Sequence, residues 1–356
     1  MLNSEKDLRI SKMLRLWYAS HQRDLPWRHT NDPYLIWISE IILQQTRVDQ
    51  GLDYYYRFTE RFPSVLDLAN AQEEEVLKYW QGLGYYSRAR NLHATAVIIK
   101  EQYAGVFPTQ YKEVLALKGI GEYTAAAITS FAWNMPYAVV DGNVFRVLSR
   151  LFGVSDPIDT GKGKKLFTEL AYALLDVPHA GEHNQAIMEF GALQCVPQSP
   201  QCAACVLQDH CVAFATNSVQ SYPVKQQKIK VTNRYLHYFH IVIDDKTYLH
   251  RRDKKDIWQG LFEFPLIETA GLQTYDALVQ TDAYKHLFEG CSIKHITLSL
   301  ANKKHVLSHQ VLYANFYTIE LSRAGAGLDG YQQIASESLD SFAVSRLMHI
   351  YLEKMA

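Results

Sequence analysis

The chain has 356 residues, of which 36 are Lys or Arg and 37 are Asp or Glu, so its formal net charge is −1. At roughly 100–200 residues per domain this length predicts two domains. The 48% apolar and 21% charged residues exclude an intrinsically disordered chain. The sequence shows neither a secretory leader nor a membrane span, so we expect a soluble cytoplasmic protein. Because the charge is balanced, any contact with nucleic acid must depend on local basic positions and backbone amides.

Helical periodicity runs through the first two-thirds of the chain. Apolar residues recur at spacings of three and four in Glu74–Trp80, Ala89–Glu101, Thr124–Phe131 and Lys164–Leu175. Short glycine-containing turns separate these segments. We therefore predict an all-helical domain over residues 1–222.

The composition changes after Cys211. A polar stretch that contains Pro223 predicts a linker over residues 223–232. Beyond it, Arg234–Asp244 and Val306–Ile319 are rich in Val, Ile, Tyr and Phe in partial alternation, which predicts strands. The expected fold is therefore multidomain, with a smaller α+β domain over residues 233–356.

Glu40 lies in a segment, Trp37–Thr46, that is apolar on nearly all sides and is predicted to be a buried helix. Burying an unpaired carboxylate is costly. Desolvation would raise the pKa of Glu40 and keep it protonated near neutrality, the state that a general acid needs. The alternative is a structural ion pair with an arginine such as Arg28 or Arg47.

A tight turn is predicted at Gly119 and Gly121, in the stretch LKGIGEYTA before a helix of small residues. Glycines permit the positive φ of such a turn, with Ile120 plugged inward between them. The turn would present amide donors at the N-terminus of the next helix, where a phosphate can bind without a basic side chain. An ordinary turn between two helices is the alternative.

Asp141 follows the apolar residues Val139 and Val140 and precedes a predicted helix, which is the position of an N-cap carboxylate. Many aspartates at such a position only cap the helix. The residues around Asp141 do not by themselves assign it a further role.

Four of the five cysteines lie close together, as Cys195-x6-Cys202-x2-Cys205-x5-Cys211. In a chain without export features thiols stay reduced, which favours a metal over disulfides. Four thiolates can hold tetrahedral Zn²⁺ or a cubane iron–sulfur cluster. The spacing alone does not separate zinc, a cluster and disulfides.

A resemblance separates these alternatives. The 6-2-5 spacing is similar to the [4Fe–4S] loop that closes the glycosylase domain of the endonuclease III superfamily. The resemblance implies a [4Fe–4S] cluster held by all four cysteines of the loop 195–211. Because no Lys or Arg lies between Cys195 and Cys211, we expect a structural or redox role for this loop rather than direct phosphate contact.

The glycine-containing turn resembles the helix–hairpin–helix of the same superfamily, which implies that Gly119 and Gly121 contact the DNA backbone. The resemblance also implies that Asp141 faces the sugar whose glycosidic bond breaks. Asn143 would help to hold this loop.

Three joined motifs narrow the resemblance: RDLPWR at 23–28, SEIILQQTRV at 39–48 and GLGYYSRARNL at 82–92. The chain resembles the A/G-specific adenine DNA glycosylases of the MutY type. Lyase-competent members of the superfamily have a lysine in the first turn after the hairpin, where this chain has Tyr123, and they lack an acid at the position of Glu40. The resemblance therefore implies a monofunctional, base-excising DNA repair enzyme.

This resemblance implies that adenine is flipped into a pocket formed with Trp27, Arg28 and Glu40. Glu40 would protonate the departing base, and Asp141 would stabilise the positive charge that develops on the sugar. Tyr123 would lie close to both carboxylates.

Three further residues are implied to bind DNA. Gln185 could offer its amide to the adenine edge. Gln45 and Tyr85 are similar to residues that enter the base stack beside the orphaned partner base. Their alternatives are a helix-capping amide for Gln45 and a core tyrosine for Tyr85.

The segment WQGLFEFP at 258–265 resembles the strand that enters the conserved box of Nudix hydrolases. The carboxylate pairs that should then bind Mg²⁺ are missing from 266–287, so we expect a Nudix-like domain without pyrophosphate hydrolysis. The adenine glycosylases use this domain to recognise 8-oxoguanine. The matching loop contains Leu307, where members often have Phe, and Ser308 and His309, which could hydrogen-bond the lesion. A plain strand end is the alternative.

The implied partner is double-stranded DNA with adenine opposite 8-oxoguanine or guanine, bound by a monomer that acts at the nucleoid of a bacterial cytoplasm without a membrane. Two other functions are alternatives. A pyrimidine-damage glycosylase/lyase of the endonuclease III type is opposed by Tyr123 and by the second domain. A non-catalytic iron–sulfur DNA-binding protein is opposed by the presence of both Glu40 and Asp141.

Overall fold

The computed structural model describes residues 5–226, 231–253 and 255–355. The chain divides into two compact units, Met1–Asn70 with Ala94–Lys228 and Ala71–His93 with Ile229–Ala356. We call the first the helical unit and the second the sheet unit. The sheet unit includes a short stretch from the predicted helical region, so the domain boundaries at 222 and 233 stay predictions.

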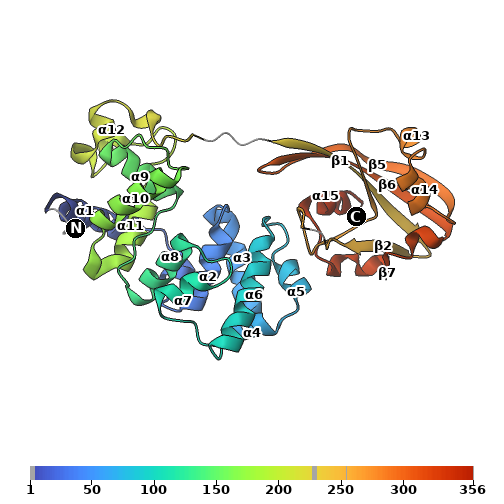
Figure 1. Cartoon of the computed structure of the whole chain (residues 1–356), viewed down its shortest axis with the longest axis horizontal. Helices are drawn as coiled ribbons and strands as arrows, with labels where there is room; N and C mark the ends of the chain where they lie inside the picture. Colours follow the sequence, from blue (N-terminus) through green and yellow to red (C-terminus); the bar gives the residue numbers. More distant parts are fainter. Residues whose placement is uncertain (1–4, 227–230, 254, 356) are drawn as a thin grey trace. The chain divides into compact units, whose positions relative to one another are not determined.

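The chain before residue 227 is helical, as predicted (Figure 1). The helices in chain order are α1 Glu5–His21, α2 Pro33–Leu43, α3 Val48–Arg61, α4 Val65–Asn70, α5 Glu73–Tyr79, α6 Ser87–Gln102, α7 Tyr111–Ala116, α8 Glu122–Trp133, α9 Gly142–Phe152, α10 Gly161–Leu174, α11 Ala180–Leu193 and α12 Val212–Ala215, with short 3₁₀ turns η1 Pro26–Arg28, η2 Val177–His179, η3 Cys202–Ala204, η4 Gln208–His210 and η5 Val219–Ser221. Along the described part of the chain, no helix is both long and apolar enough to cross a bilayer.

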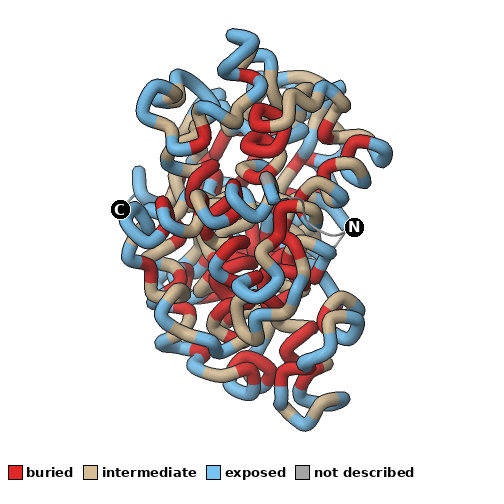
Figure 2. Tube along the Cα trace, turned by 90° about the vertical axis from the view of Figure 1, so that its left-hand side faces the viewer, coloured by how far each residue is buried: buried red, intermediate tan, exposed pale blue. Residues whose placement is uncertain are grey.

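The residues at the N-terminal ends of α2 and α9 explain where these two helices begin. The side chain of Asp32 caps α2 by accepting from the backbone N of Tyr34 at 2.8 Å, and Pro33 occupies the first helical position. Asp141 caps α9 by accepting from the backbone N of Val144 at 2.7 Å, as its position predicts. Buried and exposed stretches alternate along the tube of Figure 2, the pattern of amphipathic helices.

One core of the helical unit lies between α1, α8, α9, α10 and α11. Leu14 of α1, Val147 of α9 and Phe190 of α11 are among its buried members. Helix α2 is different because it is buried on nearly every side, from Tyr34 to Ile42. Every residue from Ile36 to Ile42 is buried whatever its type, which explains the burial of the glutamate at position 40.

The sheet unit contains seven strands in one sheet among its described residues. Their order is β3-β2-β1-β6-β5, with β4 paired to β1 and β7 paired to β2, and β1 and β6 run parallel. The elements are β1 Thr232–Ile243, β2 Lys246–Arg251, β3 Phe262–Glu263, β4 Leu266–Thr269, α13 Tyr275–Leu278, α14 Asp282–Leu287, β5 Ser292–Val306, β6 Gln310–Arg323, η6 Ala326–Leu328, β7 Gln332–Ala335, η7 Ser336–Ser341 and α15 Arg346–Met355.

Helices cover both faces of this sheet. Along β1, Leu236 and Tyr238 pack in one core with Tyr351 of α15. Phe239 of β1 packs in a second core with Tyr284 of α14. Successive side chains on a strand point to opposite faces, so this alternation separates the two cores. The predicted α+β class of the second domain is confirmed.

One predicted boundary differs from the structure, and one predicted segment lies partly outside the described residues. The strand predicted over Val306–Ile319 is wrong at its start, because Val306 ends β5 and pairs with Val311 of β6. Residues 307–309 form the turn between them, which their polar pair Ser308-His309 favours. The predicted linker includes residues 227–230, which lie outside the described residues.

Candidate active site

A cavity of about 640 Å³ opens in the helical unit, within the size range of ligand pockets. It brings together eight of the residues that the sequence singled out, from five different parts of the chain: Trp27, Arg28, Glu40, Gln45, Tyr123, Asp141, Asn143 and Gln185. The mouth of the cavity also includes Arg47 and Asp49. The remaining predicted residues lie elsewhere.

Glu40 is buried at this cavity, with 7% of its surface exposed. The hydroxyl of Tyr123 donates a hydrogen bond to Oε2 of Glu40 at 2.7 Å. Burial raises the pKa of Glu40 to about 7, the bond from Tyr123 opposes this, and the nearby charge of Asp141 adds to it. Near neutrality Glu40 is therefore substantially protonated and can donate a proton.

Asp141 is held by the first turn of α9. Its Oδ1 accepts from the backbone N of Val144, and its Oδ2 accepts from Nδ2 of Asn143 at 2.8 Å. Burial raises the pKa of Asp141, and the hydrogen bonds from Val144 and Asn143 oppose the rise. Asn143 thus holds the carboxylate, as the resemblance implied for its loop.

The contacts of Arg28, at the end of η1, show whether it forms an ion pair with Glu40. Arg28 pairs with Glu189, whose Oε2 accepts from Nη2 of Arg28 at 2.7 Å. The alternative in which Arg28 pairs with Glu40 is therefore wrong, and Arg47 is exposed. Beside this pair, the hydroxyl of Tyr18 donates to Oε1 of Gln185 at 2.6 Å, which leaves the Gln185 amide NH₂ available to a ligand.

The hairpin between α7 and α8 has the shape expected of a helix–hairpin–helix turn. Gly119 has φ +78°, so only this glycine requires the left-handed conformation, while Gly121 is extended and precedes α8 as its N-cap. Ile120 is buried between them, as predicted. The backbone N–H groups at the start of α8 remain available for a phosphate.

Gln45 and Tyr85 share an unusual backbone. Both have positive φ, +58° and +48°, which is strained for residues other than glycine. Gln45 is exposed, and Tyr85 is 47% exposed, so the alternative of a core tyrosine is wrong. Strained, exposed side chains are typical of residues that contact a ligand.

The loop at residues 307–309 lies in the sheet unit. Ser308 and His309 are exposed, whereas Leu307 packs partly against the core below α15. The hydroxyl groups of Ser308 and Tyr85, both in the sheet unit, are hydrogen-bonded to each other. The two side chains predicted to contact the partner base thus lie together in this unit.

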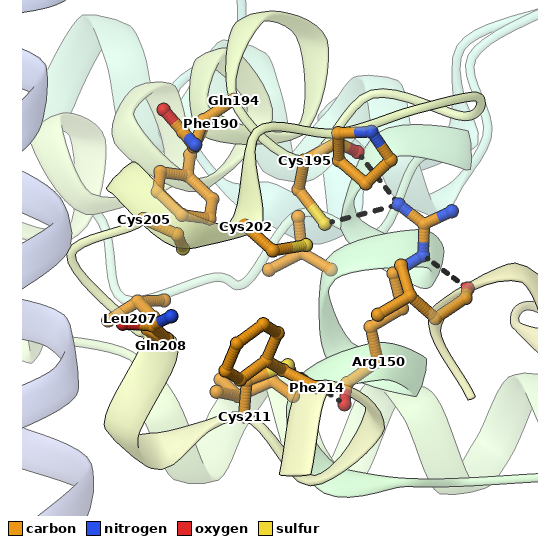
Figure 3. A pocket seen from close by; sticks show the side chains of 14 residues that line it. Arg150, Phe190, Gln194, Cys195, Cys202, Cys205, Leu207, Gln208, Cys211 and Phe214 are labelled. Carbon is orange, nitrogen blue, oxygen red and sulfur yellow. Dashed lines mark hydrogen bonds between the residues drawn. The ribbon is translucent and has the colours of Figure 1, made fainter. Parts of the chain in front are cut away.

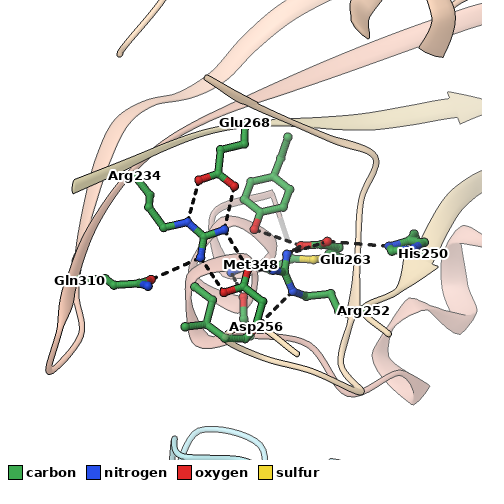
Figure 4. A network of polar contacts seen from close by, with 11 residues as sticks. Arg234, His250, Arg252, Asp256, Glu263, Glu268, Gln310 and Met348 are labelled. Atoms are coloured by element: carbon green, nitrogen blue, oxygen red, sulfur yellow. Dashed lines mark hydrogen bonds and ion pairs between the residues drawn. The ribbon is translucent and has the colours of Figure 1, made fainter. Parts of the chain in front are cut away.

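Carboxylates of the sheet unit pair with arginines (Figure 4). Arg234 bridges Asp256 and Glu268, and Arg252 bridges Asp256 and Glu263. In the described residues no group of three potential ligands is arranged for a single metal ion. The absence of Mg²⁺-dependent hydrolysis stays a prediction.

The four cysteines line one cavity of about 30 Å³, and none of them forms a disulfide. Figure 3 shows their sulfur atoms facing a shared space between η3, η4 and α12. Among the described residues these thiols are not arranged to hold a single metal ion, and four thiolates are the donors that a cubane iron–sulfur cluster takes. The donors present therefore fit an iron–sulfur cluster.

Two buried arginines of α9 connect this loop to the protein. Arg150 donates to the carbonyl oxygens of Val196 and Pro197 at 2.8 and 3.0 Å. It also donates to Sγ of Cys195 at 3.4 Å (Figure 3). Arg146 donates to the carbonyl oxygen of Cys195 at 2.7 Å and to Oδ1 of Asn143 at 2.8 Å. Arg146 thus joins the cysteine loop to the residue that holds Asp141.

The sequence patterns assign no role to Glu189, Tyr18 or these two arginines. A signal exists for Glu189, because it interrupts the apolar residues of α11 as Glu40 interrupts those of α2. Arg146 and Arg150 stand four residues apart on the polar face of α9, where arginines are commonly exposed, so the sequence offers no signal of their burial.

Three family models match the chain. They are the HhH-GPD superfamily base excision DNA repair protein over residues 38–171, the iron–sulfur binding domain of endonuclease III over 195–211 and the NUDIX domain over 237–354. The second match agrees with the donor set described above. Residues 195–211 are therefore the binding loop of a [4Fe–4S] cluster.

Two relatives match most of the chain. The adenine DNA glycosylase of Buchnera aphidicola subsp. Acyrthosiphon pisum (strain APS) is 33% identical over 313 residues, which cover 88% of this chain and 87% of that protein. The chain belongs to the adenine DNA glycosylase family. The adenine DNA glycosylase of Buchnera aphidicola subsp. Baizongia pistaciae (strain Bp) is 36% identical over 304 residues, covering 84% of this chain and 82% of that protein.

Among solved structures, a thermostable thymine-DNA glycosylase is similar to the helical part, with TM-score 0.55 and 30% identity. The match covers 59% of this chain and 98% of that one. The predicted class of enzyme is thus confirmed: a DNA glycosylase of base excision repair, a hydrolase of N-glycosyl bonds that acts on DNA.

Proposed function

We propose that this adenine DNA glycosylase removes adenine opposite 8-oxoguanine or guanine in duplex DNA and leaves an abasic site without cutting the strand. The observation that carries the proposal is the buried pair of Glu40 and Asp141 on one cavity, with Tyr123 bonded to Glu40. Such a pair supplies an acid for the leaving base and a negative charge for the sugar. Trp27, Arg28 and Gln185 form the wall that receives the flipped adenine.

Glu40 acts as the general acid in this proposal. It transfers its proton to N7 of adenine as the bond between N9 and the sugar C1′ breaks, so the base leaves neutral. Protonation in the transition state contributes ~10²–10⁴-fold to the rate. The resulting Glu40 carboxylate then helps to take a proton from the water that adds to C1′.

Asp141 remains ionised and faces the sugar. Its carboxylate stabilises the positive charge on C1′ and O4′, with Asn143 fixing its position. Tyr123 stands where a lyase has its Schiff-base lysine and has no amine to attack C1′. This difference supports a monofunctional reaction.

The lesion is recognised on the sheet unit, by Ser308 and His309 through hydrogen bonds and by Leu307 through stacking, while Gln45 and Tyr85 occupy the space beside the orphaned base. Gly119 and Gly121 bind the DNA backbone. The [4Fe–4S] cluster organises the loop 195–211, and the protein works as a monomer in the bacterial cytoplasm.

A substrate panel tests the proposal. Duplexes with adenine opposite 8-oxoguanine, guanine or thymine, and one with an oxidised pyrimidine, are incubated with the holoenzyme. We expect alkali-labile abasic sites in the first two and no cleavage before alkali. Strand cleavage without alkali, or release of the pyrimidine, would favour a glycosylase/lyase. Intact duplexes throughout, with DNA still bound, would favour a non-catalytic protein.

A further inference from the structure

Glu189 holds two arginines at the wall of the cavity. It lies on α11 with 1% of its side chain exposed. Arg23 donates to it from Nε and Nη2 at 2.8 and 2.6 Å, and from its backbone N at 3.0 Å. Arg28 donates to it from Nη1 and Nη2 at 3.0 and 2.7 Å. One carboxylate thus accepts from two guanidinium groups.

The charge of Glu189 is permanent under working conditions. Burial alone would raise the pKa of Glu189, but the hydrogen bonds from Arg23 and Arg28 lower it to about 2. Guanidinium groups carry a positive charge in proteins. The three groups therefore form a fixed network of charges.

Arg28 is the more enclosed of the two arginines, with 11% of its side chain exposed against 34% for Arg23. Its Nη1 also donates to the carbonyl oxygen of Arg23 at 2.8 Å, and its guanidinium lies 5.5 Å from the centre of the Tyr18 ring. A buried guanidinium needs a nearby carboxylate to balance its charge. Glu189 is that carboxylate here.

Glu40 lines the same cavity as both arginines. Among the described residues Glu40 has a hydrogen bond from Tyr123 and no ion pair with an arginine. The other charged or titratable groups that face the cavity come from each element around it: Arg23 and Arg28 near η1, Arg47 and Asp49 at the start of α3, Tyr123 on α8, Asp141 and Arg146 at α9, and Glu189 on α11.

We propose that Glu189 is a positioning residue that binds the charges of Arg23 and Arg28 and thereby keeps Glu40 a neutral acid. If Glu189 did not balance them, the guanidinium groups would stabilise the carboxylate form of Glu40. The catalytic consequence rests on the function proposed above, since it matters only if Glu40 donates a proton. The electrostatic part does not depend on it.

The network also fixes the geometry of the wall. Glu189 on α11 fastens Arg28 at the end of η1, whereas Gln185 lies one turn earlier on the same helix. A purely structural role would be confined to this anchoring. The ionisation of Glu40 separates the two roles, because anchoring alone does not change it.

The test measures the ionisation of Glu40 directly and without DNA. The carbonyl band of a protonated carboxyl group is followed by infrared spectroscopy against pH, as the difference between each protein and its own Glu40→Gln counterpart. The variants are Glu189→Gln, Glu189→Asp, Arg28→Gln and the double variant Glu189→Gln/Arg28→Gln. The absorbance of the iron–sulfur cluster and the melting temperature verify that each is folded.

We expect Glu189→Gln to lower the pH midpoint of the Glu40 carbonyl band by about one pH unit or more. This is the effect of an additional uncompensated guanidinium charge nearby. The double variant should recover part of this shift, and Glu189→Asp should change the midpoint less than Glu189→Gln. Arg28→Gln alone should raise the midpoint, because it removes one of the two positive charges and leaves Glu189 to balance Arg23 alone; this variant decides the matter if Glu189→Gln does not fold.

Single-turnover excision is then measured against pH. The high-pH loss of activity should move downward in Glu189→Gln in parallel with the infrared midpoint, so that activity recovers on acidification. An unchanged infrared midpoint in Glu189→Gln, with activity reduced equally at every pH, would overturn the proposal. If excision proved independent of Glu40, the proposed function would fail while the infrared result would still decide the electrostatic role of Glu189.

Discussion

The hydroxyl of Tyr123 lies 2.7 Å from Oε2 of Glu40 and donates a hydrogen bond to it from the first turn of α8. Both side chains face the cavity that also contains Asp141. The bond favours the ionised form of Glu40, whereas burial favours the neutral form, and burial dominates. The pKa of Glu40 is therefore set by the balance between burial and this hydrogen bond, and mutation can shift it in either direction.

Replacing Tyr123 with Phe should raise the pKa of Glu40, because it removes a hydrogen bond to the carboxylate. Glu40 is active when protonated, so activity is present below its pKa of about 7 and is lost above it. The Tyr123→Phe variant should therefore keep its activity to a higher pH, by up to about one unit. Single-turnover rates against pH measure this, with Tyr111→Phe, outside the lining of the cavity, as control. If the high-pH loss of activity in Tyr123→Phe moved to lower pH, this would contradict the assignment of Glu40 as the acid.

Glu40 should also affect stability in a pH-dependent way. Its pKa in the folded protein, about 7, lies above the ordinary glutamate value of 4.5, so its contribution to stability is present at low pH and is lost as pH rises through 7. Relative to the wild type, Glu40→Gln should gain on the order of 2 kcal/mol between pH 5.5 and 8.

Urea unfolding at the two pH values measures this gain. The matched control is Glu101→Gln, an exposed glutamate at the end of α6, which should not alter the pH dependence. A Glu40→Gln protein whose stability follows that of the wild type at both pH values would mean that Glu40 is ionised throughout.

Arg146 should couple the cysteine loop to the active site, because it donates to the carbonyl oxygen of Cys195 and to Asn143. Arg146→Met is expected to lower both cluster retention against a chelator and the excision rate per intact cluster. The matched control is Arg150→Met, since Arg150 donates to the cysteine loop and to Val219 and lies outside the lining of the active-site cavity. It should lower cluster retention alone. Equal effects of both variants on the rate per cluster would remove this specific role of Arg146.

The exposed turn at 307–309 should determine the choice of partner base. Ser308→Ala combined with His309→Ala is expected to reduce the ratio of excision rates opposite 8-oxoguanine and guanine by roughly tenfold, the loss of one to two hydrogen bonds. Thr297→Ala, exposed on β5 of the same hairpin, is the control. If the ratio did not change, lesion recognition would not lie in this turn.

Some of the site could be predicted because each residue departs from a local pattern. Glu40 interrupts an apolar helix, Asp141 precedes a helix after an apolar run, and the four cysteines have a characteristic spacing. Such signals lie within short stretches of chain, of which the longest is 195–211, so they need no knowledge of the fold. The same locality explains why the helical class of the first part was correct.

The partners of these residues could not be predicted, because they are distant in the chain. Arg28 binds Glu189 across 161 positions, and Tyr18 binds Gln185 across 167. Local patterns leave Arg28 as a possible partner for Glu40, and only its ion pair with Glu189 of α11 in the folded protein shows otherwise. The start of the strand predicted at Val306 was wrong for a related reason, since residues on both sides of the turn are equally compatible with a strand.

The most direct measurement of the central claim is single-turnover release of adenine opposite 8-oxoguanine by Glu40→Gln beside the wild type, with DNA affinity measured on the same duplex. Glutamine keeps the size of the side chain and cannot donate a carboxylic proton, so we predict a rate lower by ~10²–10⁴-fold with affinity retained. Release at close to the wild-type rate would contradict the assignment of Glu40 as the acid.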